Sequence, residues 1–127
     1  GRVLKVLGLP RIDRKNASAN FEKINDSISK VIKNKNSIMI FPEGKWSNQK
    51  DLLPFKKGAA YISKDFHLPI VPVVTHNAHN LMRKGEVWLR SGEITIEILD
   101  PIYKTKEISV EELTTKIYNL IDKKLEF

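Results

Sequence analysis

The sequence contains no cysteine and no long apolar segment. Without cysteine there is no disulfide framework, no thiolate nucleophile and no cysteine ligand for zinc. The longest unbroken apolar run, residues 68–74, is far shorter than the roughly 20 residues of a membrane-spanning helix. These 127 residues therefore predict neither a disulfide-stapled secreted domain nor a helical membrane span.

Several catalytic and binding motifs are also missing. There is no glycine-rich phosphate loop of standard spacing, no serine with the flanks of a nucleophile elbow and no RNA-binding signature. The three histidines, His67, His76 and His79, are too few for a zinc site, so no metal is expected. We interpret them as connector residues, with a metal or base role as the weaker alternative.

Charge is plentiful but uneven. The net charge is +7, and residues 1–36 alone carry +6. A basic face can meet anionic lipid, phosphate ligands or nucleic acid, although charge alone favours a solvated surface. The apolar fraction of 41% fits a modest globular core and excludes a disordered tail.

The apolar pattern predicts alternating helices and strands in one domain spanning residues 1–127. Ser109 and Glu112 form a capping box for the last helix, with Ile108 able to pack on Leu113. This order predicts an α/β fold. The expected helices are 19–34, 56–66 and the segment after Ser109, and the expected strands are 37–41, 69–74, and a hairpin of 87–90 with 94–99.

The segment Phe41–Ser47 places reactive groups directly after an expected strand, where α/β folds usually bind ligands. Glu43, fixed between a proline and a glycine, could bind a substrate hydroxyl, orient a cation, or simply cap a backbone amide. Lysine and arginine side chains could bind phosphate, with surface solvation or ion pairing as the alternative. The cations considered are Arg14, Lys45, Lys56 and Lys57.

Phe41-Pro-Glu-Gly-Lys-Trp-Ser47 closely resembles the third motif of the glycerolipid acyltransferases, roughly Phe-Pro-Glu-Gly-Thr-Arg-Ser. Three other segments resemble family motifs in the right order, and His76-Asn-Ala78 is similar to a segment common in bacterial members. The resemblance covers about residues 1–103. The three segments are Gly8-Leu-Pro-Arg-Ile-Asp-Arg14, Pro54-Phe-Lys-Lys-Gly-Ala59 and Leu68-Pro-Ile-Val-Pro-Val73.

The resemblance implies a mixed sheet flanked by helices, as in glycerol-3-phosphate acyltransferase. It also implies acyl transfer from acyl-CoA or acyl-carrier protein, with no other cofactor, to the hydroxyl of a lysophospholipid, 1-acylglycerol-3-phosphate above all. It places the enzyme on an anionic membrane, at the cytoplasmic face of the inner (plasma) membrane, with no nucleic acid as partner. The substrate-binding residues implied by motif position or neighbouring charge are Arg14, Glu43, Gly44, Lys45, Ser47, Lys56 and Lys57.

Two departures from the family pattern define alternatives. Lys45-Trp46 stands where the family has Thr-Arg, so another cation must bind the phosphate or the acceptor differs. No histidine is followed five residues later by aspartate, so the family's His-x4-Asp base is expected upstream of Gly1 and the fold is expected to be incomplete at its N-terminus. The rival hypotheses are a non-catalytic lipid- or phosphate-binding module of the same fold and, more weakly, a basic nucleic-acid-binding protein.

Overall fold

The computed structural model describes residues 17–45, 52–81, 88 and 90–125. The chain comprises two compact units, residues 1–40 and 41–127, and each is described by itself. The expectation of a single domain stays a prediction.

Helix α2, Ala17–Lys33, lies in the first unit and confirms the expected segment 19–34. Its end is a Schellman motif, in which Lys35 N donates to Ile32 O (2.9 Å) and Asn36 N donates to Val31 O (3.0 Å). Lys35 has the left-handed φ of 55° that this motif requires. The backbone therefore stops the helix without glycine or proline.

The strand expected at 37–41 is wrong for this structure. The described residues form no strand here, and Met39 and Phe41 are 78% and 79% exposed. An apolar, β-branched run favours a strand only when a neighbouring strand supplies hydrogen-bond partners. No ladder forms on this run in the described part of the chain.

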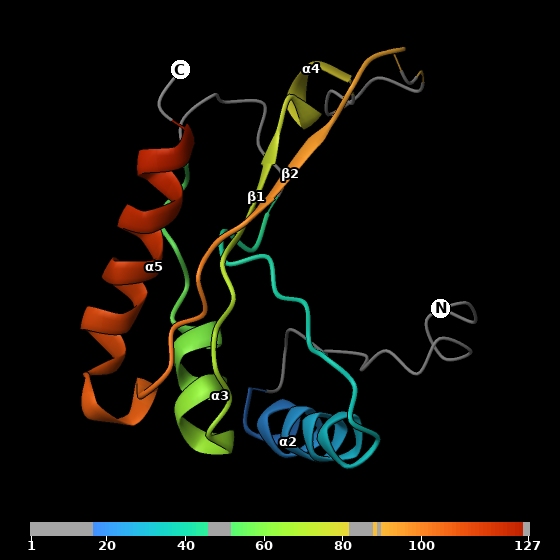
Figure 1. Ribbon diagram of the computed structural model, residues 1–127. Helices are drawn as coiled ribbons and strands as arrows, with labels where there is room; N and C mark the ends of the chain where they lie inside the picture. Colours follow the sequence, from blue (N-terminus) through green and yellow to red (C-terminus); the bar gives the residue numbers. More distant parts are fainter. Residues whose placement is uncertain (1–16, 46–51, 82–87, 89, 126–127) are drawn as a thin grey trace. The chain divides into compact units, whose positions relative to one another are not determined.

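The second unit is built around two antiparallel strands, β1 (Val73–His76) and β2 (Thr95–Ile98), drawn in Figure 1. An isolated bridge between Ile70 and Ile102 extends the pairing. The expected strand 69–74 therefore starts later. Prolines at its beginning lack the N–H that a regular ladder needs.

Of the hairpin expected between 87–90 and 94–99, the described residues form only the second strand. Trp88 and Arg90 lie in no strand, and Arg90 N donates to Leu81 O at 3.0 Å. β2 instead pairs with β1, with Val74 opposite Glu97. The prediction of a strand at 94–99 is therefore correct for β2, but the predicted partner is not.

The two faces of this sheet are unequal. Val74 is 1% exposed, whereas Ile96 and Ile98 on the opposite face are 63% and 71% exposed. Glu97 shares the face of Val74, because directly paired residues point to the same side. The isoleucine face is therefore the open one, and the core lies beneath Val74.

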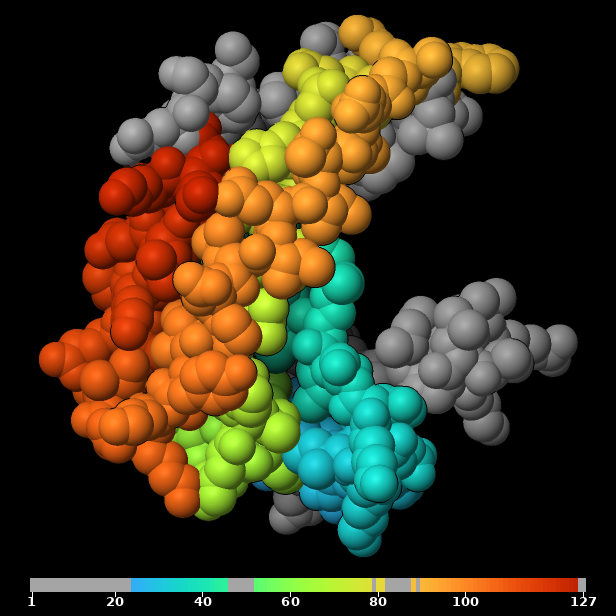
Figure 2. Space-filling view, viewed as in Figure 1, coloured from blue at the N-terminus to red at the C-terminus, as the bar shows by residue number. Residues whose placement is uncertain are grey.

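The core is closed by α3 (Gly58–Phe66) and α5 (Val110–Leu125), which lie side by side in Figure 1. In Figure 2, α5 in red adjoins the orange segment that contains β2. Leu113 is fully buried at the centre. The apolar side chains of this core are Ala60, Val74, Ile102, Leu113, Ile117 and Ile121.

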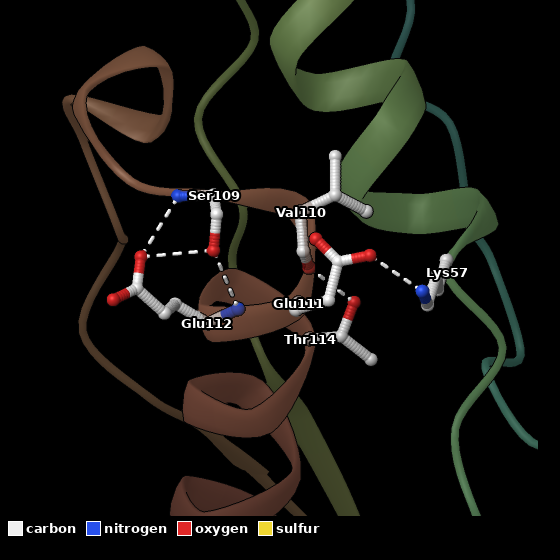
Figure 3. A network of polar contacts seen from close by, with 6 residues as sticks. All are labelled: Lys57, Ser109, Val110, Glu111, Glu112 and Thr114. Atoms are coloured by element: carbon white, nitrogen blue, oxygen red, sulfur yellow. Dashed lines mark hydrogen bonds and ion pairs between the residues drawn. The ribbon is translucent and has the colours of Figure 1, made fainter.

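The start of α5 confirms the predicted capping box. Ser109 Oγ accepts from Glu112 N (3.1 Å), and Glu112 Oε2 accepts from Ser109 N (3.0 Å), as Figure 3 shows. The pKa of the Glu112 carboxyl is lowered first by the bond from Ser109 N and then by the Ser109 hydroxyl, which donates to Glu112 Oε2 at 2.9 Å. Ile108 packs against the core that contains Leu113, as expected.

A short 3-10 helix, η1 (Thr105–Glu107), leads into α5, and a short helix α4 (Ala78–Leu81) follows β1. Lys64 of α3 donates to the carbonyls of Thr105 (3.4 Å), Lys106 (3.2 Å) and Ile108. This side chain therefore fixes the entry of α5 against α3.

Candidate functional site

The candidate site begins with a tight turn over Phe41–Gly44. Gly44 N donates to Phe41 O at 3.1 Å, which closes a four-residue β-turn. Pro42 occupies the second position, where its fixed φ fits, and Gly44 has a φ of +68°. The chain therefore reverses direction directly after the apolar run, and Glu43 is the third residue of the turn.

Two hydrogen bonds join this turn to residues 52–56. Glu43 Oε2 accepts from Leu53 N at 3.0 Å, and Pro42 O accepts from Lys56 N at 2.8 Å. Glu43 is half-buried. Of the three partners expected for Glu43, namely a substrate hydroxyl, a cation or a backbone amide, the structure shows the backbone amide.

Segment 52–55 is in turn anchored to the core. Leu52 and Phe55 pack against the buried cluster, and the Phe55 ring meets Tyr118 of α5 edge to face, with centroids 5.1 Å apart. The turn is thus connected through Glu43 to a segment that helix α5 holds in place.

Gly44 lies beneath the side chain of Lys56. A Cβ at position 44 would lie 2.9 Å from Lys56 Cε and 3.1 Å from Cδ. The methylenes of Lys56 therefore pass directly over the glycine, and this contact brings together two of the residues expected to bind substrate.

Lys57 is directed elsewhere. It occupies the N-cap position of α3, and its Nζ lies 2.5 Å from Glu111 Oε1 in the first turn of α5 (Figure 3). The hydrogen bond to Glu111 raises the pKa of Lys57, and the same bond lowers the pKa of Glu111. Adjacent lysines thus have different surroundings, Lys56 at the turn and Lys57 at the junction of two helices.

The remaining predicted residues are placed only in part. Lys45 is exposed at the end of the described turn. Arg14 and Ser47 lie outside the described residues. The structure therefore assembles Glu43, Gly44 and Lys56.

A second polar cluster, not expected from the sequence, lies where β1, β2 and α5 meet. Glu97 accepts from Lys124 Nζ at 2.6 Å (Oε1) and lies 3.3 Å from His76 Nε2 (Oε2). Lys124, and then His76, lower the pKa of Glu97. The missing signal was the pairing of β1 with β2, which brings His76 next to Glu97.

Chemically, the turn can hold an anion. The Lys56 ammonium extends from a stem packed on Gly44, and the backbone around it is fixed by the two hydrogen bonds. Lysine meets phosphate as a point charge, so it needs less angular precision than arginine. Among the described residues, no three His, Cys, Asp or Glu side chains group as metal ligands.

The comparisons assign the family. The acyltransferase family model matches residues 1–76, and this chain therefore belongs to the acyltransferase family. The relatives and the structural neighbour below are glycerolipid acyltransferases, as the four ordered motifs predicted.

Named relatives come from distant organisms. The 1-acyl-sn-glycerol-3-phosphate acyltransferase of Cocos nucifera is 39% identical over 113 residues, which cover 89% of this chain and 36% of that protein. The enzyme of the same name from Haemophilus influenzae is 33% identical over 117 residues, which cover 90% of this chain and 48% of that protein. The human 1-acyl-sn-glycerol-3-phosphate acyltransferase beta is 30% identical, over 80% of this chain and 37% of that protein.

The fold agrees with this assignment. The crystal structure of the 1-acyl-sn-glycerophosphate acyltransferase PlsC from Thermotoga maritima superposes with a TM-score of 0.69 at 25% identity. The match covers 79% of this chain and 43% of that one. The predicted α/β fold of the glycerol-3-phosphate acyltransferase type is confirmed, and this chain spans less than half the length of these relatives.

Proposed function

We propose that this chain is part of an enzyme that moves an acyl group from a thioester to the free hydroxyl of a lysophospholipid, 1-acylglycerol-3-phosphate in particular. The hydroxyl oxygen attacks the thioester carbon, the carbon–sulfur bond breaks, and the thiol of coenzyme A or acyl-carrier protein leaves. A general base takes the hydroxyl proton and returns a proton to the departing thiolate, which leaves as the thiol. The observation that carries this proposal is the family match together with the turn at Phe41–Gly44.

Within that enzyme, this chain supplies the acceptor side of the site. Lys56 is the cation best supported for the acceptor phosphate, because its stem packs on the turn. Lys45 is exposed and directly follows the turn in sequence. Arg14 and Ser47 are proposed as further phosphate- or acceptor-binding residues from their motif positions alone. Lys57 contributes only if its pair with Glu111 opens.

The catalytic base is proposed to lie outside these 127 residues. No histidine in the sequence precedes an aspartate by the family's spacing, and the residues five positions after His67, His76 and His79 are Pro72, Leu81 and Lys84. The purified chain should therefore bind acceptor and release no thiol from acyl-CoA. Thiol release that is abolished by His76→Ala would place a base here instead.

The natural site of action is proposed to be an anionic membrane, at the cytoplasmic face of the inner membrane of a bacterium. Support comes from the charge of +6 in residues 1–36 and from the bacterial-type His76-Asn-Ala78 segment. No helix in the described ranges has both the length and the apolar character to cross a membrane. Sedimentation with vesicles tests this: binding to phosphatidylglycerol vesicles that disappears at high salt is expected, and no binding would contradict it.

A non-catalytic lipid-binding module of the same fold is the second candidate. The specific observation that favours it is the absence of His-x4-Asp from this sequence. The two candidates predict the same acceptor binding and differ in turnover by the whole protein in which the chain occurs. Thiol release with lysophosphatidic acid and acyl-CoA supports the enzyme, and saturable binding without release supports the module.

A further inference from the structure

The carboxylate of Glu43 is engaged with the main chain of its own unit. Its Oε2 accepts from Leu53 N at 3.0 Å across ten positions of sequence. A backbone amide in a half-buried place needs a partner, and here a side chain supplies it. The oxygen that faces Leu53 therefore has a structural task.

We propose that Glu43 is a positioning residue that fixes the lysine-bearing segment against the turn. This inference rests on the proposed acceptor site. It says that Glu43 contributes to acceptor binding by placing Lys56 and not by contacting the acceptor itself. Glu43 holds Leu53, Pro42 O holds Lys56 N at 2.8 Å, and the Lys56 stem then lies over Gly44.

Segment 52–55 is anchored to the core, so the turn is the part that should move when the Glu43–Leu53 bond is lost. Phe55 and Leu52 are packed on the core, so this side of the Glu43–Leu53 bond is already held. The turn itself carries exposed side chains, Phe41 at 79% and Lys45. Loss of the bond should therefore leave the turn held to the segment by the Pro42 O–Lys56 N bond, and should loosen the surface on which the Lys56 side chain is supported.

Replacing Glu43 by glutamine distinguishes two roles for this residue: positioning Leu53, and contacting the acceptor through its negative charge. Glu43→Gln keeps a carbonyl oxygen at the same reach, so it can still accept from Leu53 N, but it removes the negative charge. Glu43→Ala removes both. Glu107→Gln, an exposed glutamate of η1, is the matched control for the loss of one charge.

Two readouts on the purified 127-residue chain test the proposal. Hydrogen exchange of the Leu53 amide, measured by NMR, reports the bond itself. Binding of a short-chain lysophosphatidic acid, kept below its micelle concentration, reports the acceptor site. We expect Glu43→Ala to speed Leu53 exchange and to weaken binding, each by about 5- to 10-fold, the effect of one lost hydrogen bond. Glu43→Gln should stay within about twofold of the wild type in both, as should Glu107→Gln.

Other results have definite meanings. If Glu43→Gln weakens binding as much as Glu43→Ala while Leu53 stays protected, the charge contacts the acceptor and the positioning role is overturned. Unchanged Leu53 exchange in Glu43→Ala also overturns it. If the wild-type chain binds no lysophosphatidic acid, the proposed acceptor site fails, and Leu53 exchange still decides whether Glu43 fixes the segment. Amide spectra elsewhere in unit 41–127 show whether each variant is folded.

Discussion

Gly44→Ala is the substitution that tests the geometry of the turn most sharply. Two costs arise at this position. A side chain at a φ of +68° costs about 1–2 kcal/mol in backbone strain. A Cβ 2.9 Å from Lys56 Cε forces that flexible side chain to move, which costs about 0.5–1.5 kcal/mol if it leaves its rotamer.

The expected loss of unfolding free energy is therefore about 1–3.5 kcal/mol, the lower value for backbone strain alone and the upper for both costs together. Gly58→Ala is the matched control, because nothing lies within 4 Å of a Cβ there and the residue begins α3. Alanine favours helix over glycine, so this control should be neutral or stabilising by up to about 1 kcal/mol.

Urea unfolding followed by far-ultraviolet circular dichroism measures both variants against the wild type. A Gly44→Ala/Lys56→Ala double variant then separates the two costs, because removing the lysine stem relieves only the contact. The Gly44→Ala loss should become smaller in the Lys56→Ala background while the backbone part remains. A Gly44→Ala protein as stable as Gly58→Ala would refute the geometry described for this turn.

Three further predictions concern α5 and its neighbours. Leu113→Ala should lower the unfolding free energy by about 3–5 kcal/mol, because it empties the centre of the core, whereas partly exposed Leu120→Ala should cost clearly less in the same urea assay. Ser109→Ala should cost about 1 kcal/mol through loss of the N-cap, and equal stability to the wild type would show that the cap does not act as drawn. Glu97, whose pKa is lowered mainly by Lys124, stabilises the fold above the ordinary carboxyl pKa of 4.5, and this contribution disappears as pH falls through its lower folded value. Thermal unfolding from neutral to acid pH should therefore show a weaker dependence in Glu97→Gln, and an unchanged profile would exclude this contribution.

Local sequence signals predicted the helices well. Ser109 and Glu112 determine where α5 starts through bonds over three residues, and such short-range chemistry can be read directly from the sequence. The end of α2 is similar, since Lys35 closes it with bonds to the last turn.

The pairing of the strands could not be predicted from the local sequence. The segment 94–99 contains β2 as predicted, but the partner of β2 is β1, about 20 residues earlier, and not the adjacent segment around Trp88. An alternating pattern gives the faces of a strand and does not say which neighbour completes it. The same limit hid the contact of His76 with Glu97.

The candidate site was predictable as a set of residues and not as an arrangement. The motif around Glu43 and Gly44 identified the turn, and its bond to Leu53 depends on how the chain returns. Lys56 and Lys57 look equivalent in sequence. Glu111, 54 positions after Lys57, separates them by pairing with only one.

The central claim is that the turn at Phe41–Gly44 and Lys56 bind the phosphate of a lysophospholipid acceptor. Its most direct test is a titration of the purified chain with short-chain lysophosphatidic acid and with the matching uncharged monoacylglycerol, followed at the backbone amides of Gly44, Leu53 and Lys56. We predict saturable shifts at these amides with lysophosphatidic acid, weakened by Lys56→Met, and none with the monoacylglycerol. No shifts at these amides, or equal shifts with both lipids, would contradict the claim.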